Sequence, residues 1–166
     1  MERHFDENDP LKRPKYMPRF YRCEVLFEQD ATGGVQTGTT ENGSVTINNA
    51  DFLLRKITAN ILGFSHIDYA DPSFPPGASA LDYIAGPVGF TFAWRTDSHV
   101  YTSDPVELIA AIGSQADYFD LPSPVILRPK STVTFDVTTT VPRTASTRLQ
   151  FVLHGVEPAE AYPERL

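Results

Sequence analysis

The sequence predicts an all-β protein built as an antiparallel β-sandwich, with an extended N-terminal arm and at most one short helix. One observation behind this prediction is a repeated alternation of apolar and polar residues with a period of two. Such alternation places one set of side chains on a core face. The other observation is the 14 prolines among 166 residues. Because proline is excluded from helix interiors and central strands, short strands joined by proline-bearing loops are favoured, as in a sandwich or barrel.

The clearest alternation lies in residues 132–137 and 148–154. Val133, Phe135 and Val137 share one phase of the first run, and Leu149, Phe151 and Leu153 share one phase of the second. Polar residues dominate the other phase of the first run. The polar segment 138–147 joins the two strands, so they form either a β-hairpin or neighbouring strands of a sandwich.

Further strands are expected nearer the N-terminus. Residues 21–28 alternate around Cys23, Val25 and Phe27, and residues 44–47 form a short strand. The polar, glycine-rich run 29–43 between them indicates a turn or a weak edge hairpin. Residues 51–63 are the longest strand candidate. Both phases of that run are partly apolar, so we expect a central strand that is covered on both sides.

The second half of the body begins with a long irregular connection, residues 64–87, which is rich in proline and glycine. Connections of that length are commonly functional or packed on a neighbour. Residues 88–95 then return to strand form, and their aromatic row predicts a wall of the core: Val88, Phe90, Phe92 and Trp94. Residues 104–113 fit a helix and a strand equally well, because Asp104 and Pro105 suit a helix start and Gly113 suits its end.

This pattern divides the chain into an N-terminal arm of residues 1–20, a β-sandwich domain of residues 21–158 and a C-terminal tail of residues 159–166. Pro10, Pro14 and Pro18 recur every four residues in the arm and favour an extended path. The arm is expected either to dock on another chain or to fold back onto its own domain. Fully extended, 20 residues span about 65–70 Å.

The charge is distributed unevenly along the chain. The net charge is −7, yet residues 12–22 hold five basic residues and no acidic one, while residues 23–166 hold 17 acidic and 8 basic residues. An acidic body with a basic segment favours different partners for its two parts. Basic and aromatic residues interleave in that segment, as in segments that hold phosphates while rings stack on bases. The five charges can also meet an acidic protein surface, and we expect such a partner over nucleic acid or simple solvation. The candidate partner-binding residues are Lys12, Arg13, Lys15, Tyr16, Arg19, Phe20, Arg22 and Phe74.

Residues that carry chemistry are few. Cys23 is the single cysteine, which leaves no internal disulfide and no cysteine-based zinc site, and its strand position predicts a small core residue. His66 and Asp68 have the spacing of one strand face, but the sequence nominates no third metal ligand. His154 is expected to form a hydrogen bond at a sheet edge. Three acidic residues are expected in loops: Asp68, Asp71 and Asp82. The distance between their carboxylates decides whether two of them could act as a pair in sugar hydrolysis.

Several function classes lack their sequence signals. Neither a phosphate-binding glycine loop nor a GxSxG nucleophile motif occurs. The N-terminus lacks the apolar core of a signal peptide, and no apolar run approaches the length of a membrane span. We therefore expect a protein that is not an enzyme, holds no cofactor or metal and does not bind a membrane.

Three stretches resemble small virion proteins of tailed bacteriophages. Residues 125–135 read VILRPKSTVTF and resemble a proline bend followed by a strand, the P-x-x-L-x-P-x-S-x-[VL]-x-[VF] pattern. Residues 147–155 read TRLQFVLHG and resemble a final strand of the form [RV]-[LV]-x-[FL]-V-L-x-G. Residues 49–57 read NADFLLRKI and are similar to an ADFLW-x-K-I strand. The three pieces comprise 29 of the 166 residues and are spread over positions 49–155.

The resemblance implies a jelly-roll-like β-sandwich that serves as a capsid cement or decoration protein, or as another head or tail component. The partners would be the major capsid protein or other virion subunits, in the virion on the capsid exterior, with the host cytoplasm as the site of assembly. A homo-oligomer, dimer or trimer, is expected. The alternative is a carbohydrate- or receptor-binding module of a tail or fibre, with loop tyrosines as candidates: Tyr69, Tyr83, Tyr101 and Tyr118. A third possibility, an enzyme on a cupin-like barrel, requires a metal.

Overall fold

A computed structural model describes residues 16–48, 50–62, 89–102, 104–108, 120–143 and 146–159. Expectations about Phe74, the connection 64–87 and most of both terminal segments lie outside these residues. The described residues form eight strands. The strands are β1 (Tyr16–Phe27), β2 (Thr40–Thr46), β3 (Phe52–Leu62), β4 (Phe90–Thr96), β5 (Val106–Glu107), β6 (Asp120–Leu127), β7 (Thr132–Thr139) and β8 (Thr147–Pro158).

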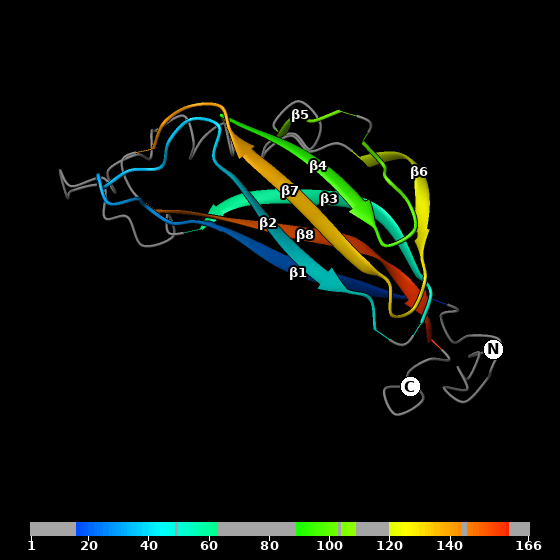
Figure 1. The fold of residues 1–166 in the computed structure, drawn as a ribbon. Helices are drawn as coiled ribbons and strands as arrows, with labels where there is room; N and C mark the ends of the chain where they lie inside the picture. The colour runs from blue at the N-terminus through cyan, green and yellow to red at the C-terminus, as the bar shows by residue number, and fades with distance from the viewer. Residues whose placement is uncertain are drawn as a thin grey trace, which may run out of the picture.

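The strands form two antiparallel four-stranded sheets that face one another, as Figure 1 shows. The strand orders are β1-β8-β3-β6 and β2-β7-β4-β5. Within this arrangement β1 pairs with β8, β2 with β7, β3 with β6 and β4 with β5. The chain thus resembles one long hairpin rolled into two layers, which is the strand order of a jelly roll. The predicted antiparallel β-sandwich is confirmed.

The core lies between the inner faces of the sheets. The expected alternations of β7 and β8 hold, and Phe135 of β7 stacks on Phe151 of β8 with ring centroids 4.4 Å apart. These two strands belong to opposite sheets, so they are neighbouring sandwich strands and not a hairpin. The aromatic row of β4 forms part of the core wall as predicted, because Phe90, Phe92 and Trp94 are buried.

The structure explains the two-sided apolar pattern of residues 51–63 by a β-bulge. Leu54 pairs with Gly155 and Lys56 with the adjacent His154, so Arg55 is an extra residue in β3. An extra residue reverses the alternation. Phe52 and Leu54 before the bulge and Ile57 and Ala59 after it are therefore all buried on the inner face. The strand is interior to its sheet as expected, but both apolar sets pack on one side.

The first strand begins earlier than the expected start of the sandwich at residue 21. Tyr16 pairs with Pro158, and the ladder with β8 continues to the pair of Phe27 with Thr147. Residues 16–20 therefore belong to the sheet and not to an arm. Proline 18 is compatible with this position because β1 is the edge strand of its sheet, where a missing N–H group is tolerated.

Two further elements refine the expectation. Residues 104–113 fitted a helix and a strand equally; Val106 and Glu107 form a strand that pairs with β4, while positions 109–119 lie outside the described residues. Strand β2 begins at Thr40, four residues before the expected strand. Its Gly43 lies against β1 so closely that an added Cβ atom would stand 2.5 Å from the carbonyl oxygen of Glu24. The two sheets thus approach one another at this edge.

Candidate protein-docking face

The outer faces of the two sheets differ in chemistry. The β2-β7-β4 face is polar: its outward positions include Thr40, Asn42, Ser44, Thr46, Thr132, Thr134, Asp136 and Thr138. Thr40 and Thr138 share a hydrogen bond of 2.7 Å, and Arg95 forms an ion pair with Asp136 at 3.1 Å. Polar groups on this face therefore bond to one another. Exposed apolar residues are concentrated instead on the outer face of the other sheet.

That second surface is here called the Phe20 face. Strand register places its members in adjacent rows across four strands: Pro18, Val156, Leu53 and Ile126 in one row, Phe20, His154 and Lys56 in the next, and Arg22, Val152 and Thr58 in a third. Tyr16 and Pro158 extend it toward the start of β1. Residues of the opposite phase on β1 and β8, such as Cys23 and Leu153, point into the core.

Large apolar side chains of the Phe20 face are open to solvent. The exposed fractions are 63% for Phe20, 56% for Tyr16 and 56% for Ile126. From strand spacing, the rows from Tyr16 to Arg22 across four strands cover roughly 300 Å². Apolar residues occupy part of this area, and the largest apolar patch of a folded domain commonly has this size and is often functional.

His154 lies at the centre of the Phe20 face. Its ring meets the ring of Phe20 edge-on at 5.2 Å between centroids, and its Nε2 atom is 2.8 Å from the Thr58 hydroxyl. Partial burial and the nearby Lys56 lower the pKa of His154 below its ordinary value. The expected hydrogen bond is present, but the expected edge position is wrong, because β8 lies between β1 and β3.

Charged residues also lie around the aromatic residues of this face, and Asp120 of β6 pairs with Lys56 in the row of Phe20 and His154. Arg22 lies one row from Phe20 on β1, and Lys56 lies in the same row on β3. The nearest acidic side chain on β1, Glu24, lies one row farther and forms an ion pair with Arg148 at 3.7 Å. The face therefore combines exposed rings and aliphatic groups with charged residues of both signs.

The inner side of the same strands carries a buried polar cluster. Glu157 is fully buried, and its carboxylate accepts a hydrogen bond from the Tyr21 hydroxyl. Arg19 completes an ion pair, with its Nε atom 3.4 Å from Glu157 Oε2. The Tyr21 oxygen also accepts from the backbone N–H of Asn48 at 3.2 Å. This cluster ties the start of β1 to the end of β8 and to the segment that follows β2.

The predicted partner-binding residues therefore separate into three groups. Tyr16, Phe20 and Arg22 lie together on the Phe20 face, whereas Arg19 binds Glu157 within the protein. The remaining four lie outside the described residues: Lys12, Arg13, Lys15 and Phe74.

The sequence reading overlooked four members of the face: Leu53, Ile126, His154 and Val156. Each of them lies in the phase opposite to a core residue, for example Ile126 beside the buried Leu127. The sequence signal that could have indicated this face was the presence of apolar residues at outward positions of alternating strands.

Other chemistry in the described part of the chain is limited. Cys23 is buried as expected, and burial, with a smaller effect of Glu24, raises the pKa of its thiol to about 12. Among the described residues, no three histidine, cysteine or acidic side chains gather in a way that fits a metal ion. Within the same residues, no helix is long and apolar enough to cross a membrane.

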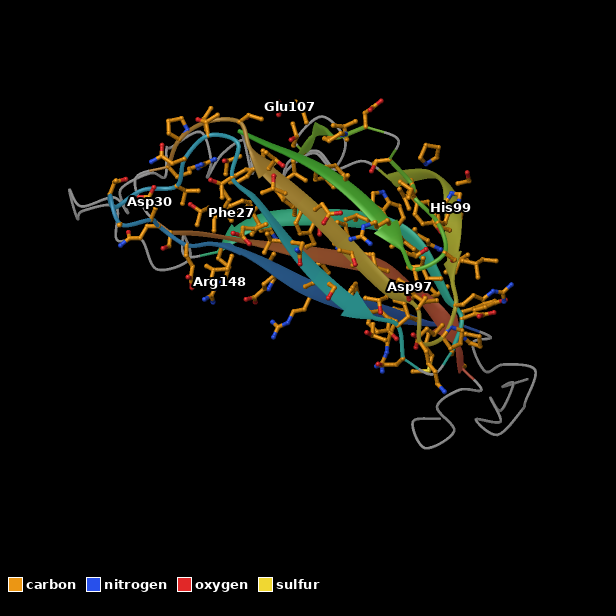
Figure 2. The ribbon with its side chains drawn as sticks, in the orientation of Figure 1. Phe27, Asp30, Asp97, His99, Glu107 and Arg148 are labelled. Atoms are coloured by element: carbon orange, nitrogen blue, oxygen red, sulfur yellow. The ribbon has the colours of Figure 1, made fainter. Side chains whose placement is uncertain are left out.

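The two ends of the sandwich carry different polar turns, and Figure 2 shows Asp30 at the end opposite to Asp97 and His99. Asp30 accepts hydrogen bonds from the Thr32 and Gln36 side chains and from backbone N–H groups, which lower its pKa to about 2. At the other end, Asp97 accepts from the backbone N–H of Thr132 at 2.8 Å. Both carboxylates hold turns together.

Comparison of the chain with protein families, with curated proteins and with solved structures found no match.

Proposed function

We propose that this protein is a non-enzymatic structural protein of a tailed-phage particle, a cement or decoration protein that docks on other virion subunits. The observation that carries the proposal is the Phe20 face, where Tyr16, Phe20 and Ile126 are exposed together on the outer face of one sheet. Aromatic side chains are enriched in protein interfaces because they remove large areas from water at a small cost in conformational entropy.

The size of the face indicates how docking works. A stable interface buries about 800 Å² of solvent-accessible surface on each partner, whereas the Phe20 face covers roughly 300 Å². One such contact is therefore weak. A particle that presents many identical sites strengthens weak contacts through effective concentration. The 15 residues before Tyr16 add up to about 50 Å of reach at full extension, and they hold three of the predicted cations.

The resemblance to phage virion proteins supports the proposal that the protein belongs to a phage particle, but it does not identify the subunit on which the protein docks. Its motif residues occupy the core and its close contacts: Phe52, Leu127, Val133, Phe135, Leu149, Phe151, Leu153 and Gly155. Jelly rolls occur in viral capsid proteins and also in lectins, so the fold is compatible with the proposal but does not select it.

Co-sedimentation with the phage particles that carry this gene tests the proposal. The wild-type protein should be detected in purified particles by mass spectrometry and should rebind to particles that lack it. Phe20→Ser should weaken rebinding at least tenfold, because it removes the most exposed ring of the face. Val100→Ser is the matched control, since Val100 is 60% exposed but lies in the turn between residues 97 and 101. Absence from particles, or equal rebinding by both variants, contradicts the proposal.

The alternative, a glycan-binding module, has less support from the described residues. Of the four candidate tyrosines, Tyr101 alone is among them, and the other three lie outside. One face of its ring stacks on Trp94 at 4.0 Å between centroids, and His99 meets it edge-on at 4.6 Å. Stacking on a sugar needs an open ring face, and Trp94 covers one of the two. A glycan array is the direct comparison, with binding that is lost in Tyr101→Ala as the result that would favour this function.

A further inference from the structure

We propose that the open edge of β1, the backbone of residues 16–22, pairs antiparallel with the same edge of a second copy of this chain. The dimer then contains one continuous sheet that runs from one copy into the other. The edge is separate from the outer surface of the sheet, so this pairing can be tested without a phage particle.

β1 is the edge strand of its sheet and presents a row of backbone groups on the side away from β8 (Figure 1). The ladder with β8 continues through Pro18 without a break, so the position that lacks an N–H group lies on the open side. The carbonyl oxygen of Glu24 points to the same side, since it approaches Gly43 of β2. Because these directions alternate along a strand, the backbone groups of the other even-numbered residues of 16–22 also point away from β8. Such an edge is a template for pairing with another chain.

The other edges of the two described sheets are less suited to pairing. The edge of β2 faces β1 near Glu24, where Gly43 makes its close approach. Strand β5 is only two residues long. Strand β6 carries Pro122 and Pro124, and its ladder with β3 is interrupted next to Val125. Among the strands that the structure describes, β1 therefore offers the longest regular edge.

A twofold axis beside Arg19 gives the register that uses every outward N–H group of this edge. Tyr16 then lies opposite the partner's Arg22, and Pro18 lies opposite the partner's Phe20. The N–H groups of Tyr16, Phe20 and Arg22 each meet a carbonyl oxygen of the other copy. Shifting the partner one way places Pro18 opposite the partner's Pro18, where neither copy has a donor. Shifting it the other way places the first residue of β1 opposite a carbonyl oxygen that β2 already approaches.

The same register matches the outward side chains. Tyr16 lies beside the partner's Arg22, which suits a cation over a ring, and Phe20 lies beside the partner's Pro18 as an apolar pair. On the inner face, Arg19 lies opposite the partner's Arg19, and like charges in that position are unfavourable. The guanidinium of Arg19 is, however, already paired with Glu157 of its own chain.

The small size of the Phe20 face favours a second copy as the occupant of the edge, an argument that rests on the proposed function. Pairing along β1 joins two outer faces into one surface of roughly 600 Å². This area is closer to the solvent-accessible surface of about 800 Å² that each partner of a stable interface buries. A strand from an unrelated protein would bring no second Phe20 face.

Sedimentation equilibrium of the full-length protein tests the pairing, and we expect a dimer. Arg22→Pro removes an outward N–H group at the kind of edge position that Pro18 already occupies, and it should weaken dimerisation at least tenfold. Arg22→Ala is the matched control, because it removes the same side chain and keeps the N–H group, and it should weaken dimerisation less than about threefold. Circular dichroism of both variants checks that they fold.

Cross-linking tests the register and does not depend on the folding of Arg22→Pro. A mixture of the single variants Tyr16→Cys and Arg22→Cys is treated with a short bismaleimide. In the proposed pair these two positions have Cβ atoms about 5 Å apart, whereas two copies of either position lie roughly 20 Å apart along the strand. A cross-linked dimer should form in the mixture and not with either variant alone. The native Cys23 is buried and does not compete.

The outcomes separate the dimer from the proposed function. A protein that stays monomeric overturns the dimer, and if that monomer rebinds to particles the proposed function stands. A dimer that does not bind particles leaves the pairing intact and overturns the proposed function. A dimer that persists in Arg22→Pro but is lost in Phe20→Ser shows that the outer faces pair instead, which also overturns the inference. Cross-linking of either cysteine variant alone overturns the register.

Discussion

At the scale of single residues, the buried carboxylate of Glu157 shows how a polar group is held inside the sandwich. It continues the inward phase of Leu149, Phe151 and Leu153 on β8, so the strand geometry directs it into the core. A buried carboxylate is costly unless it is hydrogen-bonded and paired. The Tyr21 hydroxyl and the Arg19 guanidinium provide those contacts.

Tyr21→Phe removes the hydroxyl donor to Glu157 and keeps the aromatic ring, which meets Phe52 edge-on at 5.0 Å. Because a buried acceptor loses a partner, the free energy of unfolding should fall by about 1 to 3 kcal/mol. Urea denaturation measures the change. Tyr16→Phe is the matched control, since Tyr16 is exposed, and should leave stability within about 0.5 kcal/mol. Equal effects of the two changes would argue against the buried bond.

Cys23 gives a prediction for alkaline pH. Its folded-state pKa is about 12, above the ordinary value of 9.0, so the stability linked to the protonated thiol is present below pH 9 and is lost as the pH rises toward 12. The free energy of unfolding should therefore decrease more steeply over this range in the wild type than in Cys23→Ala. Denaturation at several pH values measures both slopes, and parallel slopes would contradict the assignment.

The same residue predicts slow thiol chemistry in the folded protein. At pH 8 the thiolate fraction is very small when the pKa is about 12, and the thiolate is the reactive form. A colorimetric thiol reagent should react with Cys23 only after denaturant is added. Rapid reaction of the native protein would show that the side chain is accessible.

At the scale of elements, β3 shows what sequence patterns predict and where they stop. The run of apolar residues predicted a long interior strand, and that part is correct. The sequence also contains the change of phase between Leu54 and Ile57, but two explanations fit it, burial on both faces and a bulge. Pairing with β8 decides between them, because Arg55 has no partner position there. Partner register is a non-local property that alternation within one strand does not contain.

Deletion of Arg55 tests the bulge. Without the extra residue the alternation is continuous, with Phe52, Leu54 and Ile57 all inside and Leu53 and Lys56 outside. The deletion should therefore be tolerated, with a change of less than about 1 kcal/mol in the free energy of unfolding. Deletion of Thr58, in the regular part of the ladder, turns Ile57 outward and Lys56 inward if Ala59 keeps its inward position, and should lower the free energy of unfolding by at least about 2 kcal/mol. Denaturation of both variants measures the difference, and an equal loss of stability would contradict the role of the bulge.

The start of β1 was misplaced for a related reason. Pro14 and Pro18 and the dense charge of residues 12–22 favoured an arm, and these are local signals. Strand pairing with residues 153–158 of β8 overrides them, since an edge strand tolerates Pro18 on its open side. The local pattern of residues 104–113 fitted a helix and a strand equally, and Val106 and Glu107 form a strand because they pair with β4 in the second sheet.

At the scale of the whole molecule, the sandwich and most of its core followed from alternation and proline content, because burial on one face imposes a period of two. The rolled strand order did not follow, since local patterns do not say which strands pair. The candidate site was predicted only in part. The sequence singled out Tyr16, Phe20 and Arg22 because they are basic or aromatic. Their neighbours on β3, β6 and β8 belong to the Phe20 face only because strand pairing places them beside these residues.

Removal of residues 1–15 separates the sandwich from the segment before it. The truncated protein begins at Tyr16 and keeps the full β1 ladder, so its circular dichroism spectrum should remain that of a β-sheet protein. Its rebinding to phage particles should be weaker than that of the wild type, because the contacts that Lys12, Arg13 and Lys15 are proposed to add are lost. Removal of residues 160–166 is the control. Unchanged particle binding after the first truncation would exclude this segment from docking.

The pairing of Tyr16 with Pro158 also has a practical consequence for engineering. Position 16 and position 158 are cross-strand neighbours, so a short glycine-serine linker could join them and new ends could be opened in the exposed turn at residues 31–33. Such a circular permutant would place a fused reporter at the pole far from Asp97 and His99, where it would stand clear of the Tyr16 side of the molecule.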